Sequence, residues 1–315
     1  MPVYKINKLK LEPLSNRKFD LEDDIQRLTE QNLEILFGIK FVSGASNQEF
    51  HVPVQEQEFY IDTLAFDEEQ RSFVIIEYKK DRSFSVIDQG FAYLSAILNH
   101  KADLILETNE RLGKNLKKSD IDWDASRVIF ISPEFTNYQK NAINFKDLPF
   151  YLYEVDYYTG DIIDYSPIKP YQTSASVTPF IKDAKIQKVA KEIKVYTIED
   201  HYKKASPQTI ELLNEMRERI KQIDNGINEK PVGDYIGYKN NWFNFVSIHV
   251  HKDKLKVTVR KDKLINDIAN KLTKYPDSYK WGKTSLWWMD VNSDKTIDYI
   301  MPIIKEAYEA APDNK

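Results

Sequence analysis

The chain has 315 residues, enough for two domains of ordinary size, and its 42% hydrophobic content is typical of a globular protein. The absence of cysteine excludes disulfides and thiolate metal sites, and five scattered histidines without an HExxH pair argue against a histidine-bound zinc. A net charge of −4 argues against a protein that coats duplex DNA by charge alone, although a local patch can still bind nucleic acid.

Helical and strand patterns alternate in the first half of the chain. Apolar residues at helical spacing predict a helix over 20–37, with Asp20 as its N-cap and Gly38 at its end. The β-prone segments 59–66 and 73–79 are joined by the turn DEEQRS. The elements expected next are a helix over 86–100 and strands over 102–107, 127–132 and 150–156. This alternation predicts an α/β domain over residues 1–170.

A polar, irregular stretch predicts a linker over 171–198. Its lysines, three apart from Lys182 to Lys194, drift around a helix and favour a solvated strip over a basic face for nucleic acid. Residues 199–315 predict a smaller α+β domain that binds nucleic acid or a partner, or mediates dimerisation. Its expected elements are helices over 206–223, 262–273 and 294–309 and strands over 234–239, 242–250, 254–260 and 284–290.

Three ionisable residues form the most informative pattern. Side chains alternate along a strand, so Glu77 and Lys79 point the same way. Asp62 lies on the preceding strand and comes close to Glu77 if the two strands pair through their turn. Two carboxylates and an amine then meet at one end of a sheet. This set suits phosphodiester cleavage, because Mg²⁺ or Mn²⁺ prefers carboxylate ligands and the lysine can position the attacking water.

A second pattern follows on the next predicted helix. Gln89 and Tyr93 are four residues apart, so they share a helix face. From there they can reach the lysine, the water or a backbone phosphate of a substrate. As an alternative, the two side chains merely cap the core.

The ordered set Asp62, Glu77-x-Lys79 and Gln89-x-x-x-Tyr93 resembles the PD-(D/E)XK nuclease superfamily, in its branch with a QxxxY helix. The resemblance covers roughly residues 15–160 and departs from the family name at residue 61, where Ile replaces proline. It implies a restriction-endonuclease-like mixed sheet flanked by helices. The second domain resembles an uncharacterised domain often found after such nucleases.

The resemblance also extends to the first helix. Related nucleases carry a glutamate there that joins the metal site, which implies Glu22 as a third ligand, with Glu30 as the second choice. Gln26 lies between them on the same helical stripe. Taken alone, either glutamate is more often a solvated helix position than a metal ligand.

Two further groups have structural as well as functional interpretations. Lys252, Lys254 and Lys256 would share one strand face, either as a phosphate-contacting edge or as protection of an edge strand against aggregation. The tryptophans at positions 281, 287 and 288 favour a core or interface over base stacking.

Together these patterns predict a divalent-metal-dependent endonuclease acting on DNA. The alternatives are a catalytically inactive nuclease fold that binds nucleic acid or protein, and an interaction protein whose second domain carries the function. A homodimer is one expected assembly. Neither a Walker loop nor GxGxxG is present, so no nucleotide cofactor is expected. The sequence has no membrane-length apolar stretch or apolar signal core, so we expect a cytoplasmic protein without membrane contact.

Overall fold

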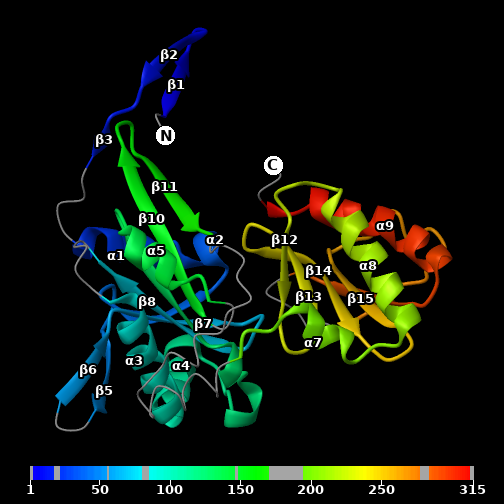
Figure 1. Ribbon diagram of the computed structural model, residues 1–315, viewed down its shortest axis with the longest axis horizontal. Helices are drawn as coiled ribbons and strands as arrows, with labels where there is room; N and C mark the ends of the chain where they lie inside the picture. Colours follow the sequence, from blue (N-terminus) through cyan, green and yellow to red (C-terminus); the bar gives the residue numbers. More distant parts are fainter. Residues whose placement is uncertain are drawn as a thin grey trace. The chain divides into compact units, whose positions relative to one another are not determined.

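The computed structural model describes residues 3–17, 22–54, 57–79, 85–145, 148–169, 194–276 and 284–312; the side chains of residues 22, 53, 54 and 57–59 are not described. The chain forms two compact units, Met1–Val195 and Tyr196–Lys315. Figure 1 shows the helices and strands of both units. In the described part of the chain, no helix is long and apolar enough to cross a membrane.

The first unit is built around a mixed sheet of seven strands, which confirms the predicted α/β class. The helices are α1 (Glu22–Gln31), α2 (Leu33–Phe37), α3 (Val86–Asn99), α4 (Lys101–Leu112) and α5 (Asn137–Ala142). The strands are β1 (Tyr4–Asn7), β2 (Lys10–Pro13), β3 (Asn16–Arg17), β4 (Lys40–Gly44), β5 (Phe50–Val54), β6 (Gln57–Ile61), β7 (Thr63–Asp67), β8 (Ser72–Tyr78), β9 (Arg127–Ser132), β10 (Phe150–Tyr158) and β11 (Ile162–Ile168). Hairpins β1–β2 and β5–β6 pair outside the main sheet.

The main sheet runs in the order β11-β10-β9-β8-β7-β4, with β3 also paired to β10. Strand β7 is antiparallel to both of its neighbours, β4 and β8, whereas β8, β9 and β10 run parallel. Residues 73–76 are fully buried because both faces of the sheet are covered. Phe73 and Ile75 face the cluster that includes α3 and α4, while Val74 and Ile76 face the cluster that includes Ile25 of α1.

Three parts of the first unit differ from the sequence predictions. Residues 102–107 belong to α4 and not to a strand, because this short apolar run buries Leu104 but leaves Leu106 exposed, as on an amphipathic helix. The predicted strand over 59–66 is divided at a bend at Asp62. The polar segment before it contains strand β5 of the β5–β6 hairpin. Gly38 ends α2 in the left-handed conformation as expected, whereas Asp20 lies outside the described residues.

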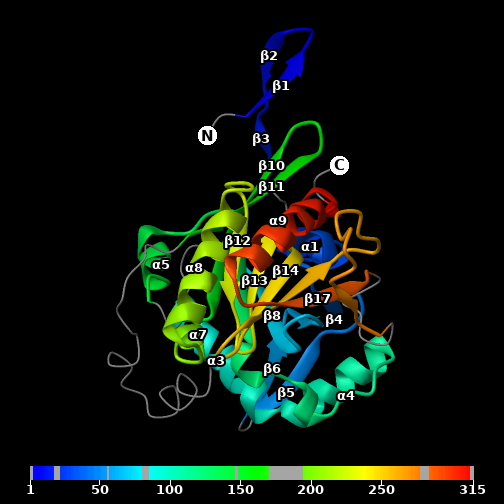
Figure 2. The ribbon, with the colours of Figure 1, turned by 90° about the vertical axis from the view of Figure 1, so that its right-hand side faces the viewer.

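The second unit packs two helices against one antiparallel sheet, and this confirms a smaller α+β domain. The helices are α7 (Ile198–Tyr202), α8 (Pro207–Lys221) and α9 (Asp294–Glu309). The sheet runs β12 (Asn228–Pro231), β13 (Ile236–Asn240), β14 (Phe243–Val250), β15 (Leu255–Arg260), β17 (Leu286–Val291) and β16 (Thr273–Lys274). Figure 2 shows α8 and α9 on one side of this sheet.

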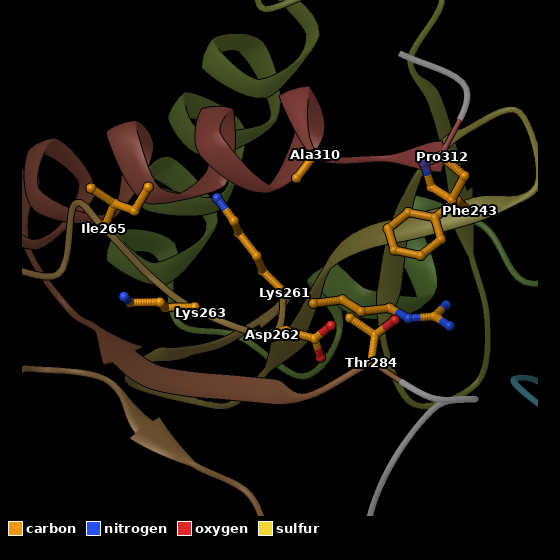
Figure 3. Close-up of a pocket in the computed structure, with 9 residues that line it drawn as sticks. Phe243, Lys261, Asp262, Lys263, Ile265, Thr284, Ala310 and Pro312 are labelled. Atoms are coloured by element: carbon orange, nitrogen blue, oxygen red, sulfur yellow. The ribbon is translucent and has the colours of Figure 1, made fainter. Parts of the chain in front are cut away.

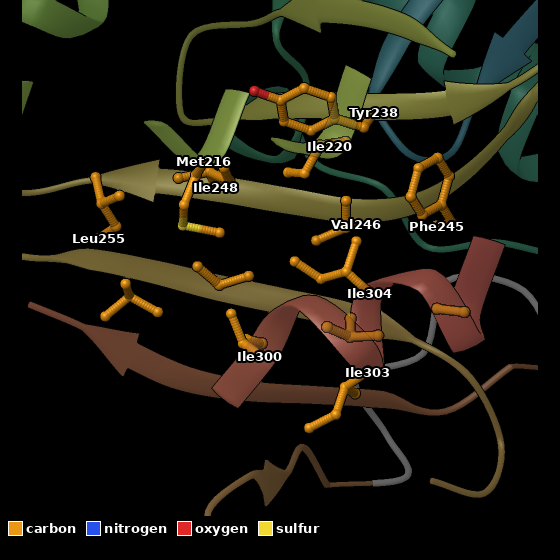
Figure 4. Packing of buried hydrophobic residues seen from close by; sticks show 14 of the residues in the cluster. Met216, Ile220, Tyr238, Phe245, Val246, Ile248, Leu255, Ile300, Ile303 and Ile304 are labelled. Carbon is orange, nitrogen blue, oxygen red and sulfur yellow. The ribbon is translucent and has the colours of Figure 1, made fainter. Parts of the chain in front are cut away.

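The core of the second unit is formed by apolar side chains from α8, α9 and the inner sheet face. Met216 and Ile220 of α8 and Ile300 and Ile304 of α9 meet side chains such as Val246 (Figure 4). All of these are at most 1% exposed, so the unit has a core of its own.

The predicted helix over 262–273 is wrong. The structure describes residues 261–272 throughout, and they form an irregular loop that ends at β16. The loop is held by a residue far away in the sequence: Glu306 of α9 accepts hydrogen bonds from the backbone N–H groups of Ile265 and Asn266, both at 2.8 Å. A pattern of local charges cannot reveal that contact.

Candidate active site

The structure brings together the two carboxylates that the sequence paired. Asp62 occupies the bend between β6 and β7, and Glu77 lies one residue before the end of β8. The β7–β8 register pairs Thr63 with Ile76, so it places Asp62 opposite Glu77. Both side chains point to the sheet face that α3 covers, and their carboxyl groups are close enough to share a hydrogen bond.

The Glu77 carboxylate is buried and holds the other two groups of the site. Its side chain is 3% exposed, one oxygen forms an ion pair with the Lys79 ammonium, and the other accepts a hydrogen bond from the Tyr93 hydroxyl. Lys79 follows the end of β8, and its backbone N–H donates to Ile131 of β9 at 2.9 Å. The parallel neighbour strand therefore continues the extended backbone through Lys79, which keeps its side chain on the face of Glu77.

Burial and charge raise the pKa of Asp62 to about 8. Burial is the larger cause and the neighbouring Glu77 carboxylate the next. A hydrogen bond from the backbone N–H of Tyr78 to Asp62 Oδ2, at 3.1 Å, and the charge of Lys79 lower this pKa. The raised value marks a place where a second positive charge would favour ionisation of Asp62, as a bound cation does.

This raised pKa predicts that the metal-free protein loses stability as the pH rises. The unfolded chain ionises Asp62 near its ordinary pKa of 3.8, whereas the folded chain holds the proton up to about pH 8. The stabilising contribution is therefore complete below about pH 4 and is lost by pH 8, at up to about 1.4 kcal/mol per pH unit. Urea unfolding in EDTA at pH 5 and pH 8 should show this loss in wild type and not in Asp62→Asn. Parallel pH curves for the two proteins would contradict it.

Helix α3 carries Gln89 and Tyr93 one turn apart, and its Tyr93 hydroxyl contacts the Glu77 carboxylate. The backbone N–H of Asp88 donates a hydrogen bond to Ser85 Oγ (3.3 Å) and so caps the start of α3, and Gly90 lets the helix lie close to the sheet. A Cβ at Gly90 would be 2.5 Å from the Phe150 ring, so a larger residue would push the helix outward. Tyr93 has a raised pKa, because of burial first and the charge of Glu77 second, so its hydroxyl remains a donor. In the described structure the buried Gln89 Oε1 has no hydrogen-bond partner.

Glu30 lies in a buried hydrogen-bond network on the α1 side of the sheet. It is 4% exposed, and its Oε1 accepts bonds from Thr63 Oγ1 (2.6 Å), Ala45 N (3.0 Å) and Gln26 Nε2 (3.0 Å). Its Oε2 accepts from Ser46 N at 2.7 Å. With its carboxylate engaged by four donors from β7, α1 and the loop after β4, we leave Glu30 out of the metal ligands proposed below.

Gln26 and Gly44 connect this Glu30 cluster to Asp62. Gln26 Nε2 also donates to the Asp62 carbonyl oxygen at 2.6 Å. A Cβ at Gly44 would be 2.1 Å from Glu30 Oε1 and 2.8 Å from the same Asp62 oxygen. A side chain at position 44 would therefore collide with both the Glu30 carboxylate and the backbone at the Asp62 bend. The sequence marks Gln26 by its helical stripe, but it carries no signal for Gly44.

The donor set for a metal ion consists of two carboxylates. Among the residues whose side chains are described, no group of three or more His, Asp or Glu could hold a metal. Glu22 begins α1, but its side chain lies outside the described set, so its predicted role as third ligand is not tested. Mg²⁺ binds through one or two carboxylates, and waters or substrate oxygens complete its shell. Asp62 and Glu77 fit that requirement.

The three lysines expected on one strand face do not share one. Lys252 and Lys254 lie in the turn before β15, and Lys256 lies within the strand. Lys254 pairs with Asp290 at 2.7 Å, and the Lys256 ammonium lies 4.2 Å from the centre of the Trp288 ring. The turn between β14 and β15 includes Lys252 and Lys254, so β15 begins only at Leu255. Trp281 lies outside the described residues, and Trp287 packs against the core of the second unit.

A cavity of about 410 Å³ lies in the second unit, between the end of β15 and the end of α9 (Figure 3). Its lining includes Arg260, Lys261 and Phe243. The Lys261 ammonium is paired with Glu306 at 2.6 Å, and the Arg260 guanidinium lies over the Phe243 ring at 4.3 Å. Both cations therefore already have partners within the second unit. None of the described residues predicted as a site from the sequence lines this cavity.

Comparisons with known proteins place the chain among uncharacterised relatives. An uncharacterized protein of Haemophilus influenzae is 35% identical over 309 residues, which cover 98% of this chain and 99% of that protein. The chain belongs to the family of that protein. Within it, residues 198–311 match a domain of unknown function, DUF5655, which agrees with the uncharacterised domain that the sequence resembled.

A solved structure, the crystal structure of a repair endonuclease from Pyrococcus abyssi, aligns with part of the chain. The alignment covers 43% of this chain and 48% of that one, so the chain spans about half the length of that nuclease. The identity is 17% and the TM-score 0.24. At that score the similarity carries no argument about fold or function.

Proposed function

We propose that the first unit is a divalent-metal-dependent nuclease of the PD-(D/E)XK type that hydrolyses phosphodiester bonds in DNA. One observation carries the proposal: Asp62, Glu77 and Lys79 meet at the end of two paired strands, with a pKa of Asp62 raised to about 8. Carboxylates pressed together in a buried place without a full counter-charge are costly for folding, and a cation-binding role accounts for them.

Each residue has a role that its position supports. Asp62 and Glu77 would hold Mg²⁺ or Mn²⁺, and Glu22 is proposed as a further ligand from the resemblance alone. The cation would supply positive charge that stabilises the phosphate as it is attacked. Lys79 is placed beside Glu77 to orient the attacking water, and the Tyr93 hydroxyl keeps the Glu77 carboxylate in position. Gln89, one helical turn before Tyr93, has a buried Oε1 without a hydrogen-bond partner and is proposed as a further polar group of the site.

A cleavage assay tests the proposal. Labelled single-stranded, duplex and branched DNAs are incubated with the full chain in Mg²⁺, Mn²⁺ or EDTA. We expect cleavage only with a divalent metal, and a loss of roughly 10²- to 10⁴-fold in Lys79→Ala, the range for a positioned proton-transfer group.

The matched control is Lys40→Ala, which removes a surface lysine paired with Glu34 in the same unit at 2.6 Å and should keep full activity. DNA binding by wild type without cleavage under any metal would favour the inactive nuclease fold instead. Cleavage that persists in EDTA would refute the metal requirement.

A further inference from the structure

A cleft of about 470 Å³ lies between α1 and the β5–β6 hairpin, and one of its lining side chains, Gln26, reaches the backbone of Asp62. Its volume is in the range of ligand sites. Gln26 and Gly44 line it, and both are in close contact with the Asp62 carbonyl oxygen, as described above. A group bound in this cleft would therefore lie next to the backbone that positions one of the two carboxylates.

Two aromatic rings form part of the cleft wall. His51 of β5 and Tyr60 of β6 are directly paired across the hairpin, and their ring centres are 5.5 Å apart at an interplanar angle of 34°. Tyr60 is 54% exposed and His51 is exposed as well. Figure 1 shows the hairpin extending away from the main sheet. Exposed rings of this kind stack on nucleic-acid bases without regard to sequence.

The charges in the cleft exclude a groove that follows duplex phosphates. Arg27 is the lining arginine, and the carboxylates of Asp23 and Glu49 line the same cleft. A duplex-binding surface neutralises several phosphates with lysine and arginine, and carboxylates oppose that. An aromatic pair beside polar groups such as the Gln48 amide suits an uncharged base better than a row of phosphates.

We propose that this cleft receives an unpaired base, so that the nuclease prefers DNA that is single-stranded or has a single-stranded segment next to the scissile bond. This inference rests on the proposed function. The base stacks on the Tyr60 ring, Arg27 contacts a neighbouring phosphate, and the strand continues around the bend at Asp62 to the sheet face where the carboxylates of Asp62 and Glu77 lie. A base within an intact duplex is already stacked and paired, and cannot enter without the cost of extrusion.

The test is a binding measurement without cleavage. Fluorescence anisotropy in EDTA compares a short labelled single strand with the same sequence as a duplex. We expect the single strand to bind at least about tenfold more tightly, and Tyr60→Ala to weaken single-strand binding about tenfold, within the range for one base–aromatic stack. Tyr60→Phe keeps the ring and should retain binding. The control is Tyr138→Ala, which removes a tyrosine of α5 that is 78% exposed and should bind as wild type does.

Three results would overturn the inference: equal affinity for duplex and single strand, no single-strand binding by wild type, or wild-type binding by Tyr60→Ala. These results are distinguishable from failure of the proposed function. Single-strand binding that depends on Tyr60, without cleavage in Mg²⁺ or Mn²⁺, would refute the nuclease and keep the base site. Metal-dependent cleavage of duplex DNA that is indifferent to Tyr60 would do the reverse.

Discussion

Asp62→Asn should reduce DNA cleavage at least about a thousandfold while the protein stays folded. A metal ion lowers the free energy of the charged transition state by several kcal/mol, and each 1.36 kcal/mol changes the rate about tenfold. The substitution removes one of two proposed ligand carboxylates from the buried pair. Asparagine can still accept the bond from the Tyr78 N–H and donate to Glu77, so the local structure should survive. The measurement is the initial rate of cleavage at saturating Mg²⁺.

The same variant provides its own control for folding. Without metal at pH 8, Asp62→Asn should unfold at a higher urea concentration than wild type, because it lacks the buried charge. An inactive but more stable protein would separate loss of chemistry from loss of structure. Cleavage within tenfold of wild type would show that Asp62 does not hold the metal.

Glu30→Ala should lower the free energy of unfolding by about 3 kcal/mol or more, because each buried donor left without an acceptor costs about 1–3 kcal/mol. The carboxylate accepts four bonds, from Gln26, Ala45, Ser46 and Thr63, and its removal leaves these donors without that acceptor. Chemical denaturation at pH 7 measures the difference.

Glu34→Ala is the matched control on the neighbouring helix α2. Glu34 is 66% exposed and pairs with Lys40 on the surface, so its loss should cost less than about 1 kcal/mol. Equal effects of the two substitutions would show that the Glu30 cluster does not hold the loop after β4. A Glu30→Ala protein that is stable but fails to bind Mn²⁺ would instead identify Glu30 as a metal ligand.

The parts that the sequence predicted well depend on local signals. The helix over 294–309 was predicted with the bounds that α9 has, because its apolar residues recur at helical spacing. The pairing of Asp62 with Glu77 was predictable because the turn between their strands is short, so register follows from the chain itself.

What the sequence could not predict depends on contacts between distant residues. The Glu30 cluster joins residues up to 33 positions apart. The close approach at Gly90 depends on Phe150, and the loop over 261–272 on Glu306. Strand β5 does alternate apolar and polar residues, but it is only five residues long and contains Pro53, which weakens a strand prediction, so the hairpin and the aromatic pair at its base are not predicted from the sequence.

The central claim is that Asp62 and Glu77 share one divalent cation, and a crystal soaked in Mn²⁺ tests it most directly. We expect an anomalous difference peak bounded by the carboxylates of both residues, and no such peak in crystals of Asp62→Asn. A fully occupied Mn²⁺ bound elsewhere in a protein that cleaves DNA, with the space between these carboxylates empty, would contradict the account.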